Sequence, residues 1–484
     1  MTILASKRSL FAAVLLFGLL AMTARSATDP DLWWHLRTGQ WIAETGHVPH
    51  SDPFSFTRAG RTWVAQEWLS EIIFYQLWTH AGPAALIVFA SLVTTLGFLI
   101  LYARCPVQPH YAAALTVLGA FASASCWGAR PQMFTFTLAS LLLWLIERGL
   151  MEPGKARPRL LLWIPPLFLF WLNLHAGFAL GLAILILHAT GLACEAIAGT
   201  TPWSQARPLI LRVLAVTAVC FALVPLNPSG AQLYRYPFDT LRSSGMRSYI
   251  VEWLSPNFHR LLYFPFLLDL LLLLVALNYS RSSLKARTLL PLLFATLAAL
   301  DAVRHIPIFI LFAIPVIAAA LPASSISLLP PRPIPARRRP AFHTTALVLL
   351  AAFAIVRWTS LARSQPATQA SLFPQKAVAF LKVNPLPDRL FAYYDWGGYV
   401  IWQLAPQYRV FSDGRADLYT RGILHKSMDT LGLLHDSWRS VLDNWNVQTI
   451  LVPPNTALAQ ALLLDPGWRP CYRDHQAIVF TRKG

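Results

Sequence analysis

The sequence predicts an α-helical polytopic membrane protein of about 11 spans with a small C-terminal α/β domain outside the membrane. Of its 484 residues, 56% are hydrophobic and only 13% are charged, and the mean hydropathy is +0.48. Soluble globular chains carry about 25% charged residues. The deficit extends along most of the chain, where apolar runs of bilayer length recur. Basic residues lie between these runs in a regular alternation.

The apolar runs give the expected spans. A helix that crosses a bilayer needs roughly 20 apolar residues. We expect spans at 8–26, 83–104, 109–127, 131–148, 160–175, 176–198, 208–226, 261–279, 288–303, 305–322 and 341–358. The regions 160–198 and 288–322 each permit a different count. The first span resembles a signal peptide, but Ala24-Arg25-Ser26-Ala27 is a poor cleavage site, so we expect it to be retained.

The basic residues set the expected topology. With the N-terminus in the cytoplasm, every strongly basic short loop lies on the cytoplasmic side, as the positive-inside rule requires. These loops hold Lys7, Arg8, Arg104, Arg148, Lys155, Arg157, Arg159, Arg207, Arg212, Arg281, Lys285, Arg287, Arg332, Arg337, Arg338 and Arg339. The net charge of +18 therefore reflects topology, and we expect no nucleic-acid partner. We expect a multi-pass protein of the inner (plasma) membrane, with membrane lipids as partners and an extracytoplasmic C-terminus.

Three long segments face outward in this topology: 27–82, 227–260 and 359–484. We divide the chain into a transmembrane domain at 1–358 with a long first outer loop at 27–82, a linker at 359–372, and an α/β domain at 373–484. The stretch from Glu67 to Trp78 is amphipathic and is expected at the membrane interface. Six tryptophans of the first outer loop are expected at the headgroup level, namely Trp33, Trp34, Trp41, Trp63, Trp68 and Trp78.

The tail beyond residue 370 alternates between helical and extended patterns. Helices are expected at 374–382, 398–404, 437–444 and 458–463, and strands at 390–394, 409–411, 449–452 and 477–482. This alternation predicts mostly parallel strands.

Polar side chains collect at the outer ends of the expected spans. An ionisable residue costs roughly 2.5–3.5 kcal/mol at the centre of a span, so such residues tend to mark sites or pathways. The set comprises Asp29, Asp31, His35, Arg130, Gln132, Asn173, His175, Glu252, Asp301, Arg304 and His305, and the first outer loop adds Asp52 and Glu67 as further candidates. Carboxylates serve as general bases or cation ligands, and arginines bind phosphate oxygens in bidentate fashion. The combination suits a reaction in which a phosphate leaves and a nucleophile loses a proton.

Each of these residues also has a structural alternative. Asp29-Pro-Asp31 is positioned to cap a helix beginning near Leu32, and Asp52 and Glu67 are alternatively solvated loop charges. Asn173 and His175 alternatively only form hydrogen bonds with backbone groups at a helical break, and Glu252 is alternatively an interfacial anchor. Arg304 and His305 alternatively extend towards the lipid headgroups, or form a local ion pair with Asp301. Asp413-Gly-Arg415-Ala-Asp417 is either a turn with a salt bridge or an acceptor contact at a strand end.

Four short stretches resemble the GT-C glycosyltransferase superfamily. They are Asp29-Pro-Asp31-Leu-Trp-Trp-His35, Trp171-Leu-Asn173-Leu-His175-Ala-Gly177, Glu252-Trp253-Leu-Ser255-Pro256 and Arg304-His305-Ile-Pro307. With the many spans and the outward tail, they resemble protein mannosyltransferases, aminoarabinose transferases and oligosaccharyltransferases. The oligosaccharyltransferase Trp-Trp-Asp signature is missing. The nearest string is Asp395-Trp396-Gly-Gly, so peptide glycosylation is not supported.

The resemblance implies transfer of a sugar, of hexosyl type, from a polyprenyl-phosphate-linked donor to an acceptor on the outer face. Asp29 or Asp31 would be the base, and both would bind a divalent cation such as Mg or Mn if one is used. The other substrate-binding candidates are His35, Glu67, Arg130, Asn173, His175, Glu252, Arg304 and His305.

Two other functions stay open: a non-catalytic assembly protein on the same fold, and a transporter or flippase. Transporters tend to show repeated halves and breaks at the midplane, whereas this chain has one long first loop and polar residues at one face. The sequence has no Walker A pattern, dinucleotide loop, nucleophile elbow or His-Glu-x-x-His motif. The five cysteines form neither a zinc spacing nor a disulfide framework.

Overall fold

The computed structural model describes residues 7–150, 157–279, 284–321, 339–420, 422–434 and 437–483. The chain divides into two compact units whose segments alternate along the sequence. The first consists of Met1–Arg25, Ile87–Leu226 and Val251–Ala362, and the second of Ser26–Leu86, Asn227–Ile250 and Arg363–Gly484. Five basic residues of the expected cytoplasmic loops, Lys155, Arg281, Arg332, Arg337 and Arg338, lie outside the described residues.

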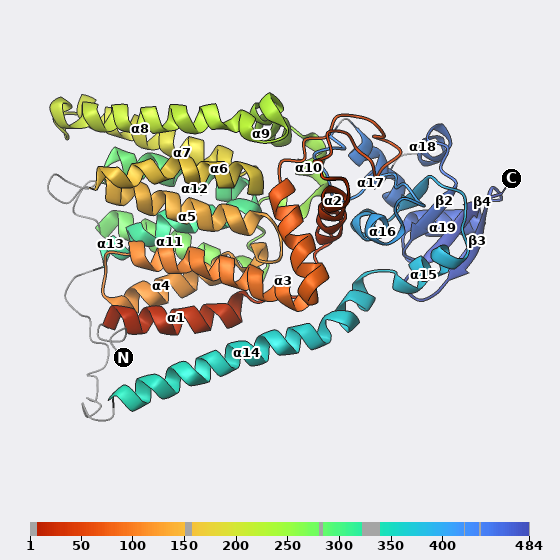
Figure 1. The fold of residues 1–484 in the computed structure, drawn as a ribbon, viewed down its shortest axis with the longest axis horizontal. Coiled ribbons are helices and arrows are strands. Elements are labelled where there is room, and N and C mark those ends of the chain that lie inside the picture. Colours follow the sequence, from red (N-terminus) through yellow and green to blue (C-terminus); the bar gives the residue numbers. More distant parts are fainter. Residues whose placement is uncertain are drawn as a thin grey trace. The chain divides into compact units, whose positions relative to one another are not determined.

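The first unit is a helical bundle (Figure 1). Its helices are α1 (Lys7–Thr23), α4 (Pro109–Ala122), α5 (Gln132–Gly149), α6 (Ile164–Leu174), α7 (Phe178–Ile197), α8 (Trp203–Leu223), α11 (Phe264–Tyr279), α12 (Ala286–Asp301) and α13 (Ile306–Ala320). Short 3-10 segments flank them: η1 (Ala124–Cys126), η2 (Pro158–Trp163), η3 (Val224–Leu226), η5 (Val251–Trp253), η6 (Leu261–Tyr263) and η7 (Val303–His305). Two longer helices, α3 (Trp68–Arg104) and α14 (Arg339–Leu372), contribute residues to both units.

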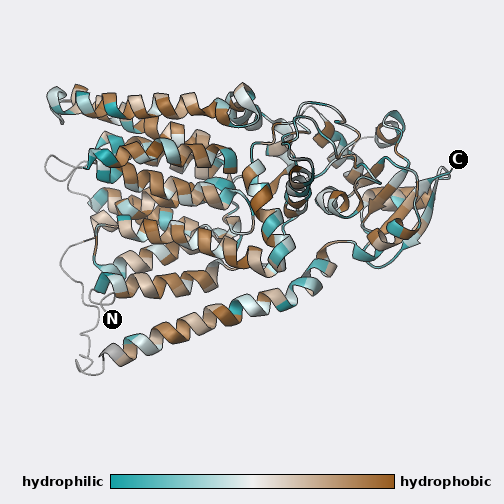
Figure 2. Ribbon diagram, viewed as in Figure 1, coloured by the Kyte–Doolittle hydropathy of each residue, from teal (hydrophilic) through white to brown (hydrophobic). Residues whose placement is uncertain are grey.

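These helices agree with a polytopic membrane protein. Each of the eleven expected spans contains a helix, and within the described residues six helices are long and apolar enough to cross a bilayer. Figure 2 shows apolar residues along the length of the bundle helices. Apolar side chains that remain exposed on these helices, such as Leu214, Leu274 and Phe353, suit contact with lipid.

Small residues let the bundle helices approach closely. A Cβ atom on Gly191 of α7 would lie 2.3 Å from the Cα atom of Arg287 in α12. At the same crossing, the backbone N–H and the Nε of Arg287 each donate to Glu195 Oε1 at 3.0 Å. Close approach at glycine is a common way for membrane helices to pack, because lipid provides no hydrophobic force between them.

Helix α3 is interrupted at Gly82-Pro83. Gly82 has a φ of 70° and a ψ of −172°, which lie outside the helical region, and Pro83 removes a helix hydrogen bond. The stretch from Glu67 to Trp78 therefore belongs to a separate helical segment that precedes the apolar run beginning at residue 83.

The second unit combines short helices with one sheet. The helices are α2 (Leu32–Thr45), α9 (Tyr236–Leu241), α10 (Ser244–Tyr249), α15 (Gln375–Val383), α16 (Gly397–Leu404), α17 (Ile423–Gly432), α18 (Trp438–Asn444) and α19 (Ala457–Leu464), with 3-10 segments η4 (Gly230–Tyr234) and η9 (Tyr394–Trp396). The strands are β1 (Leu390–Ala392), β2 (Thr449–Val452), β3 (Trp468–Arg473) and β4 (Ile478–Arg482), in the order β1-β2-β4-β3.

The prediction of mostly parallel strands is wrong. β1 and β2 pair in parallel, with Leu390 opposite Thr449, but β4 runs antiparallel to both β2 and β3. The missed strand β3 contains Pro470 and is largely exposed, as befits an edge strand. The expected strand at 409–411 is reduced to isolated bridges from Val410 to Leu390 and Ser55. The expected linker at 359–372 is helical, as part of α14.

The expectation for the tryptophans of the first outer segment is also wrong for three of them. Trp33, Trp34 and Trp63 are buried inside the second unit. The ring of Trp33 makes edge contacts with Trp78, Phe373 and Tyr399 at centroid distances of 5.0–5.5 Å. Aromatic packing of the first outer segment on the C-terminal residues therefore builds the core of this unit.

Candidate functional site

The Asp29–Asp31 segment leads into helix α2. Asp29 Oδ1 accepts a hydrogen bond from the backbone N–H of Asp31 at 2.9 Å, which fixes the turn before the helix. Asp31 occupies the N-cap position but makes no side-chain capping hydrogen bond. Its Oδ1 instead accepts from Trp34 Nε1 at 3.3 Å. Both aspartates are partly exposed. The capping alternative is therefore not what the Asp31 side chain does.

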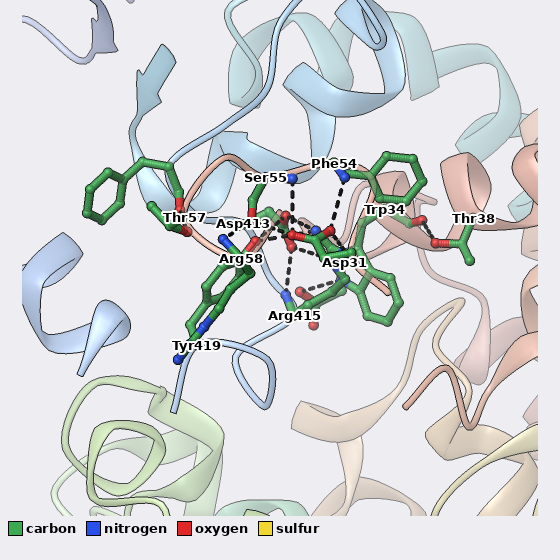
Figure 3. Close-up of polar contacts among 12 residues, drawn as sticks. Asp31, Trp34, Thr38, Phe54, Ser55, Thr57, Arg58, Asp413, Arg415 and Tyr419 are labelled. Atoms are coloured by element: carbon green, nitrogen blue, oxygen red, sulfur yellow. Dashed lines mark hydrogen bonds and ion pairs between the residues drawn. The ribbon is translucent and has the colours of Figure 1, made fainter. Parts of the chain in front are cut away.

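A buried cation ties the first outer segment to the C-terminal residues (Figure 3). Arg415 Nη1 lies 2.8 Å from Asp52 Oδ1, and its Nη2 lies 2.7 Å from Asp413 Oδ2; all three side chains are fully buried. The Tyr419 hydroxyl donates to Asp413 Oδ2 at 2.8 Å. The guanidinium also lies 4.6 Å from the centroid of Trp63. Burial alone would lower the pKa of Arg415, but Asp413 and Asp52 outweigh it and raise that pKa well above its usual range.

Asp52 is thus neither a free loop charge nor exposed to a substrate. Its oxygens also accept from the backbone N–H groups of Phe54 and Ser55 at 3.0 and 3.1 Å, and from the Ser55 hydroxyl. The Asp413-Gly-Arg415 sequence forms the expected turn with a salt bridge, with its partner 363 residues away in the chain.

Two glycines of the C-terminal residues lie directly against the Asp29–Asp31 segment. A Cβ atom on Gly414 would lie 2.0 Å from Asp31 Oδ1, and one on Gly398 would lie 2.9 Å from the carbonyl oxygen of Pro30. The buried Tyr394 hydroxyl lies near both Asp31 and Asp413. Burial first, and then these two carboxylates, raise the pKa of Tyr394 well above its usual range.

A second acidic group surrounds His35 on α2. Its Nε2 lies 3.7 Å from Glu67 Oε2 and its Nδ1 lies 3.6 Å from Glu71 Oε1. The structure therefore brings the predicted residues His35 and Glu67 together. It adds Glu71, which sequence reasoning missed although it lies one helical turn after Glu67, on the same face. All three side chains are buried or nearly so.

Asp417 ends the stretch Asp413-Gly-Arg415-Ala-Asp417, for which the sequence left a turn with a salt bridge and an acceptor contact open. The Tyr236 hydroxyl donates a hydrogen bond to Asp417, and Gln66 Nε2 donates to the same hydroxyl at 2.8 Å. Burial raises the pKa of Asp417, an effect that Arg415 partly opposes. The contact between Asp417 and Tyr236 was missed, because the two residues lie far apart in the sequence.

In the first unit, Arg130 and Arg304 have different partners. Arg130 Nη1 pairs with Glu252 Oε1, and Gln132 Nε2 approaches Glu252 Oε2 at 3.4 Å. The Arg304 guanidinium lies over the ring of Trp253 at 4.5 Å from its centroid. The Glu252-Trp253 dipeptide therefore holds both arginines, which is more specific than an interfacial anchor.

His305 and His175 lie nearby in the same unit. The ring of His305 meets Trp253 edge-on at a centroid distance of 6.3 Å. His175 interacts electrostatically with both Arg304 and Arg130. The four predicted groups Arg130, Arg304, His305 and His175 thus belong to one neighbourhood.

Asn173 and His175 also make the structural contacts expected at a helical break. Asn173 Nδ2 donates to the Leu169 carbonyl at 2.8 Å, and the Gly177 N–H donates to His175 Nδ1 at 3.0 Å. The Thr135 hydroxyl lies 2.7 Å from the same nitrogen. Because Nδ1 accepts the Gly177 bond, the neutral imidazole carries its proton on Nε2. Thr135 was missed from the sequence because nothing distinguishes it from other span residues.

The described side chains were compared with the requirements of a metal centre. No group of three or more His, Cys, Asp or Glu side chains within the described ranges is arranged to hold a metal ion. Asp29 and Asp31 supply two carboxylates, one of which is already bonded to backbone and the other to Trp34. A divalent cation at these residues therefore stays a prediction that the geometry does not favour.

Several solved structures have an architecture similar to that of this chain. The chain is similar to an archaeal oligosaccharyltransferase, AglB from Archaeoglobus fulgidus in complex with an inhibitory peptide and a dolichol-phosphate. The sequence identity is 12% and the TM-score 0.57, over 92% of this chain and 69% of that one. This fold is GT-C-like. A second structure, the Archaeoglobus fulgidus oligosaccharyltransferase in complex with Zn and sulfate, agrees at 13% identity and a TM-score of 0.53, over 91% and 68%.

ArnT from Cupriavidus metallidurans bound to undecaprenyl phosphate is a further neighbour of this GT-C-like fold. It has 14% identity and a TM-score of 0.48, over 97% of this chain and 96% of that one. No family model matches the sequence, and no curated protein matches it. At these identities the two oligosaccharyltransferase structures establish the fold alone, and the activity has to be argued from the residues.

Proposed function

We propose that this chain is an integral membrane glycosyltransferase that moves a sugar, of hexosyl type, from a polyprenyl-phosphate-linked donor to an acceptor on the outer face of the inner membrane. The observation that carries the proposal is the Asp31 carboxylate. It is partly exposed, does not cap its helix, and is held by Trp34 on a GT-C-like fold. Neighbours on that fold are an oligosaccharyltransferase in complex with a dolichol-phosphate and a protein bound to undecaprenyl phosphate.

In the proposed reaction, the carboxylate of Asp31 takes the proton of an acceptor hydroxyl. The hydroxyl oxygen then attacks the anomeric carbon from the face opposite the phosphate, so that the configuration inverts. The bond between the anomeric carbon and the phosphate oxygen breaks, and the lipid phosphate leaves with the electron pair. Asp29 fixes the turn that presents Asp31, through the hydrogen bond to its backbone.

The cations of the first unit are the proposed ligands of the donor phosphate. The Arg304 guanidinium lies 4.5 Å from the centroid of the Trp253 ring, and a guanidinium can bind two phosphate oxygens through its planar fork of N–H groups. Arg130 is already paired with Glu252, so a phosphate would have to compete with that carboxylate. His175 belongs to the same neighbourhood and would supply a neutral donor through its Nε2–H. The Nδ1–H of His305 is bonded to the Ala298 carbonyl at 3.1 Å, so the neutral His305 ring has no second N–H to donate.

The proposal is tested with the purified full-length protein in lipid nanodiscs. The measurement is release of radiolabelled sugar from a panel of polyprenyl-phosphate-linked hexoses by the wild type and by the variants Asp29→Ala, Asp31→Ala and Asp31→Asn. Asp443→Asn is the matched control, because the side chain of that aspartate is 60% exposed and pairs with Arg482 at the surface. We expect a loss of at least about 100-fold for the Asp31 variants and none for the control.

Two outcomes would contradict the proposal in different ways. Turnover that survives in both Asp31 variants would keep a transferase but remove its base. No turnover by the wild type on any donor of the panel would favour an assembly protein or a flippase. A flippase would be recognised by movement of lipid between the two leaflets after the purified protein is reconstituted into liposomes.

A further inference from the structure

The Asp413–Arg415 turn is held at a fixed place on the first outer segment. Arg415 is fully buried between Asp52 and Asp413, and its guanidinium also lies against the ring of Trp63. A buried arginine that bonds two carboxylates through a rigid planar fork has very little freedom to move. The residue between the two charges, Gly414, is therefore fixed as well.

Gly414 is required by the space that Asp31 occupies. Its φ is not in the left-handed region, unlike that of the six glycines with positive φ in the described residues. A Cβ atom there would lie 2.0 Å from Asp31 Oδ1 and 3.0 Å from Trp34 Nε1. The first distance is far inside any van der Waals contact, so an alanine could be accepted only if the Asp31 carboxylate moved.

Trp34 contacts the same Asp31 oxygen. Trp34 Nε1 donates to Oδ1 at 3.3 Å, and the ring of Trp34 is 9% exposed and so has little room to follow a displaced carboxylate. Gly398 bounds the preceding residue, because its Cβ would lie 2.9 Å from the Pro30 carbonyl oxygen. The C-terminal residues thus press on the Asp29–Asp31 segment at two points.

We propose that the Asp413-Gly414-Arg415 turn is a positioning element for the Asp31 carboxylate, with Arg415 anchoring the turn and Gly414 leaving the gap into which the carboxylate fits. The inference rests on the proposed function, because it gives the C-terminal residues a role in the transfer step. Gly414 and Arg415 act through Asp31 and do not touch the substrate. A displacement of about 1 Å in a reacting group is enough to lower a rate about 100-fold.

The test is Gly414→Ala, alone and combined with Asp31→Ala, in the sugar-release assay. We expect Gly414→Ala to lower kcat about 100-fold while KM for the donor changes less than about threefold, because the donor phosphate is held by other residues. In the Asp31→Ala background the same substitution should cause no further loss. Gly467→Ala is the matched control: its Cβ also meets an aspartate oxygen, that of Asp465 at 3.2 Å, away from Asp31.

Trp34→Phe covers the case in which Gly414→Ala does not fold. It removes the donor to Asp31 Oδ1 and adds no atoms. We expect a fall in kcat of about tenfold that again disappears in the Asp31→Ala background. Full activity of a folded Gly414→Ala protein would overturn the inference while leaving the proposed function in place. So would equal losses with and without Asp31, since a purely structural glycine would give that result. A wild type without transfer activity would overturn both.

Discussion

Replacing Arg415 by methionine should destabilise the second unit severely. The substitution keeps the apolar contact with Trp63 but leaves Asp52 and Asp413 as two fully buried carboxylates without their cation. Removing one partner of a buried ion pair typically costs about 3–5 kcal/mol. In a folding unit of roughly 200 residues, each kcal/mol shifts Tm by about 2–4 °C, so the expected fall is about 6–20 °C.

The loss of stability caused by Arg415→Met should depend on pH. In the variant, the two buried carboxylates avoid an unpaired charge by binding protons, and the folded state then binds more protons than the unfolded one. Stability therefore falls as pH rises, and the deficit relative to wild type should be larger at pH 8 than at pH 5. The assay is thermal unfolding in detergent at both pH values, with hydrogen exchange of segments 51–57 and 411–419 to assign the loss to this unit.

Arg409→Met is the control for this experiment. Arg409 pairs with Asp388 at 3.1 Å, and their side chains are 45% and 36% exposed. An exposed pair of this kind contributes about 0–1 kcal/mol, so the control should lose no more than about 4 °C. If Arg415→Met fell in the same range, or if its deficit did not shrink at pH 5, the argument from burial and charge would be refuted.

Three further predictions follow from contacts in both units. Glu252→Gln removes the charge that pairs with Arg130, so undecaprenyl phosphate should inhibit sugar release about fivefold more strongly; weaker inhibition would mean that Arg130 does not meet the phosphate. Burial raises the pKa of Asp417, so its contribution to stability is full below the unfolded value and is lost as pH rises through the folded one; Asp417→Asn should show a flatter dependence of Tm on pH between 4 and 8, and an unchanged slope would contradict this. Gly191→Ala places a Cβ 2.3 Å from the Arg287 backbone and should lower Tm by several degrees, whereas Gly18→Ala, which meets nothing within 4 Å, should not.

The helices of the first unit were predictable because the bilayer makes their signal simple. A helix that crosses the hydrocarbon core is a run of about 20 mostly apolar residues, and each such run in the sequence contains a helix. The sheet was only partly predictable. β2 at Thr449–Val452 is fully buried and appeared as expected, but β3 is an exposed edge with Pro470 inside it and carried no alternating pattern.

The candidate site divides in the same way. Asp31, His35 and Glu67 could be named as site candidates from the sequence, because ionisable residues close to a membrane span tend to mark functional sites. The role of Arg415 could not, because its partner Asp52 lies 363 residues away and nothing local distinguishes a buried ion pair from a surface turn. The burial of Trp33 was missed for the same reason, since it packs on Phe373 and Tyr399.

The interleaving of the two units fixes an order of events during synthesis. The second unit needs residues 26–86, but its sheet and Arg415 come from residues 363–484, after nearly all of the first unit has left the ribosome. Until then Asp52 lacks Arg415, and Trp33 lacks two of its three aromatic partners, Phe373 and Tyr399, so part of the apolar surface of the first outer segment stays uncovered. Domains usually fold as they emerge from the ribosome. Here a chain truncated before residue 415 would lack the contacts that complete the folding of its first outer segment as well as its C-terminal part.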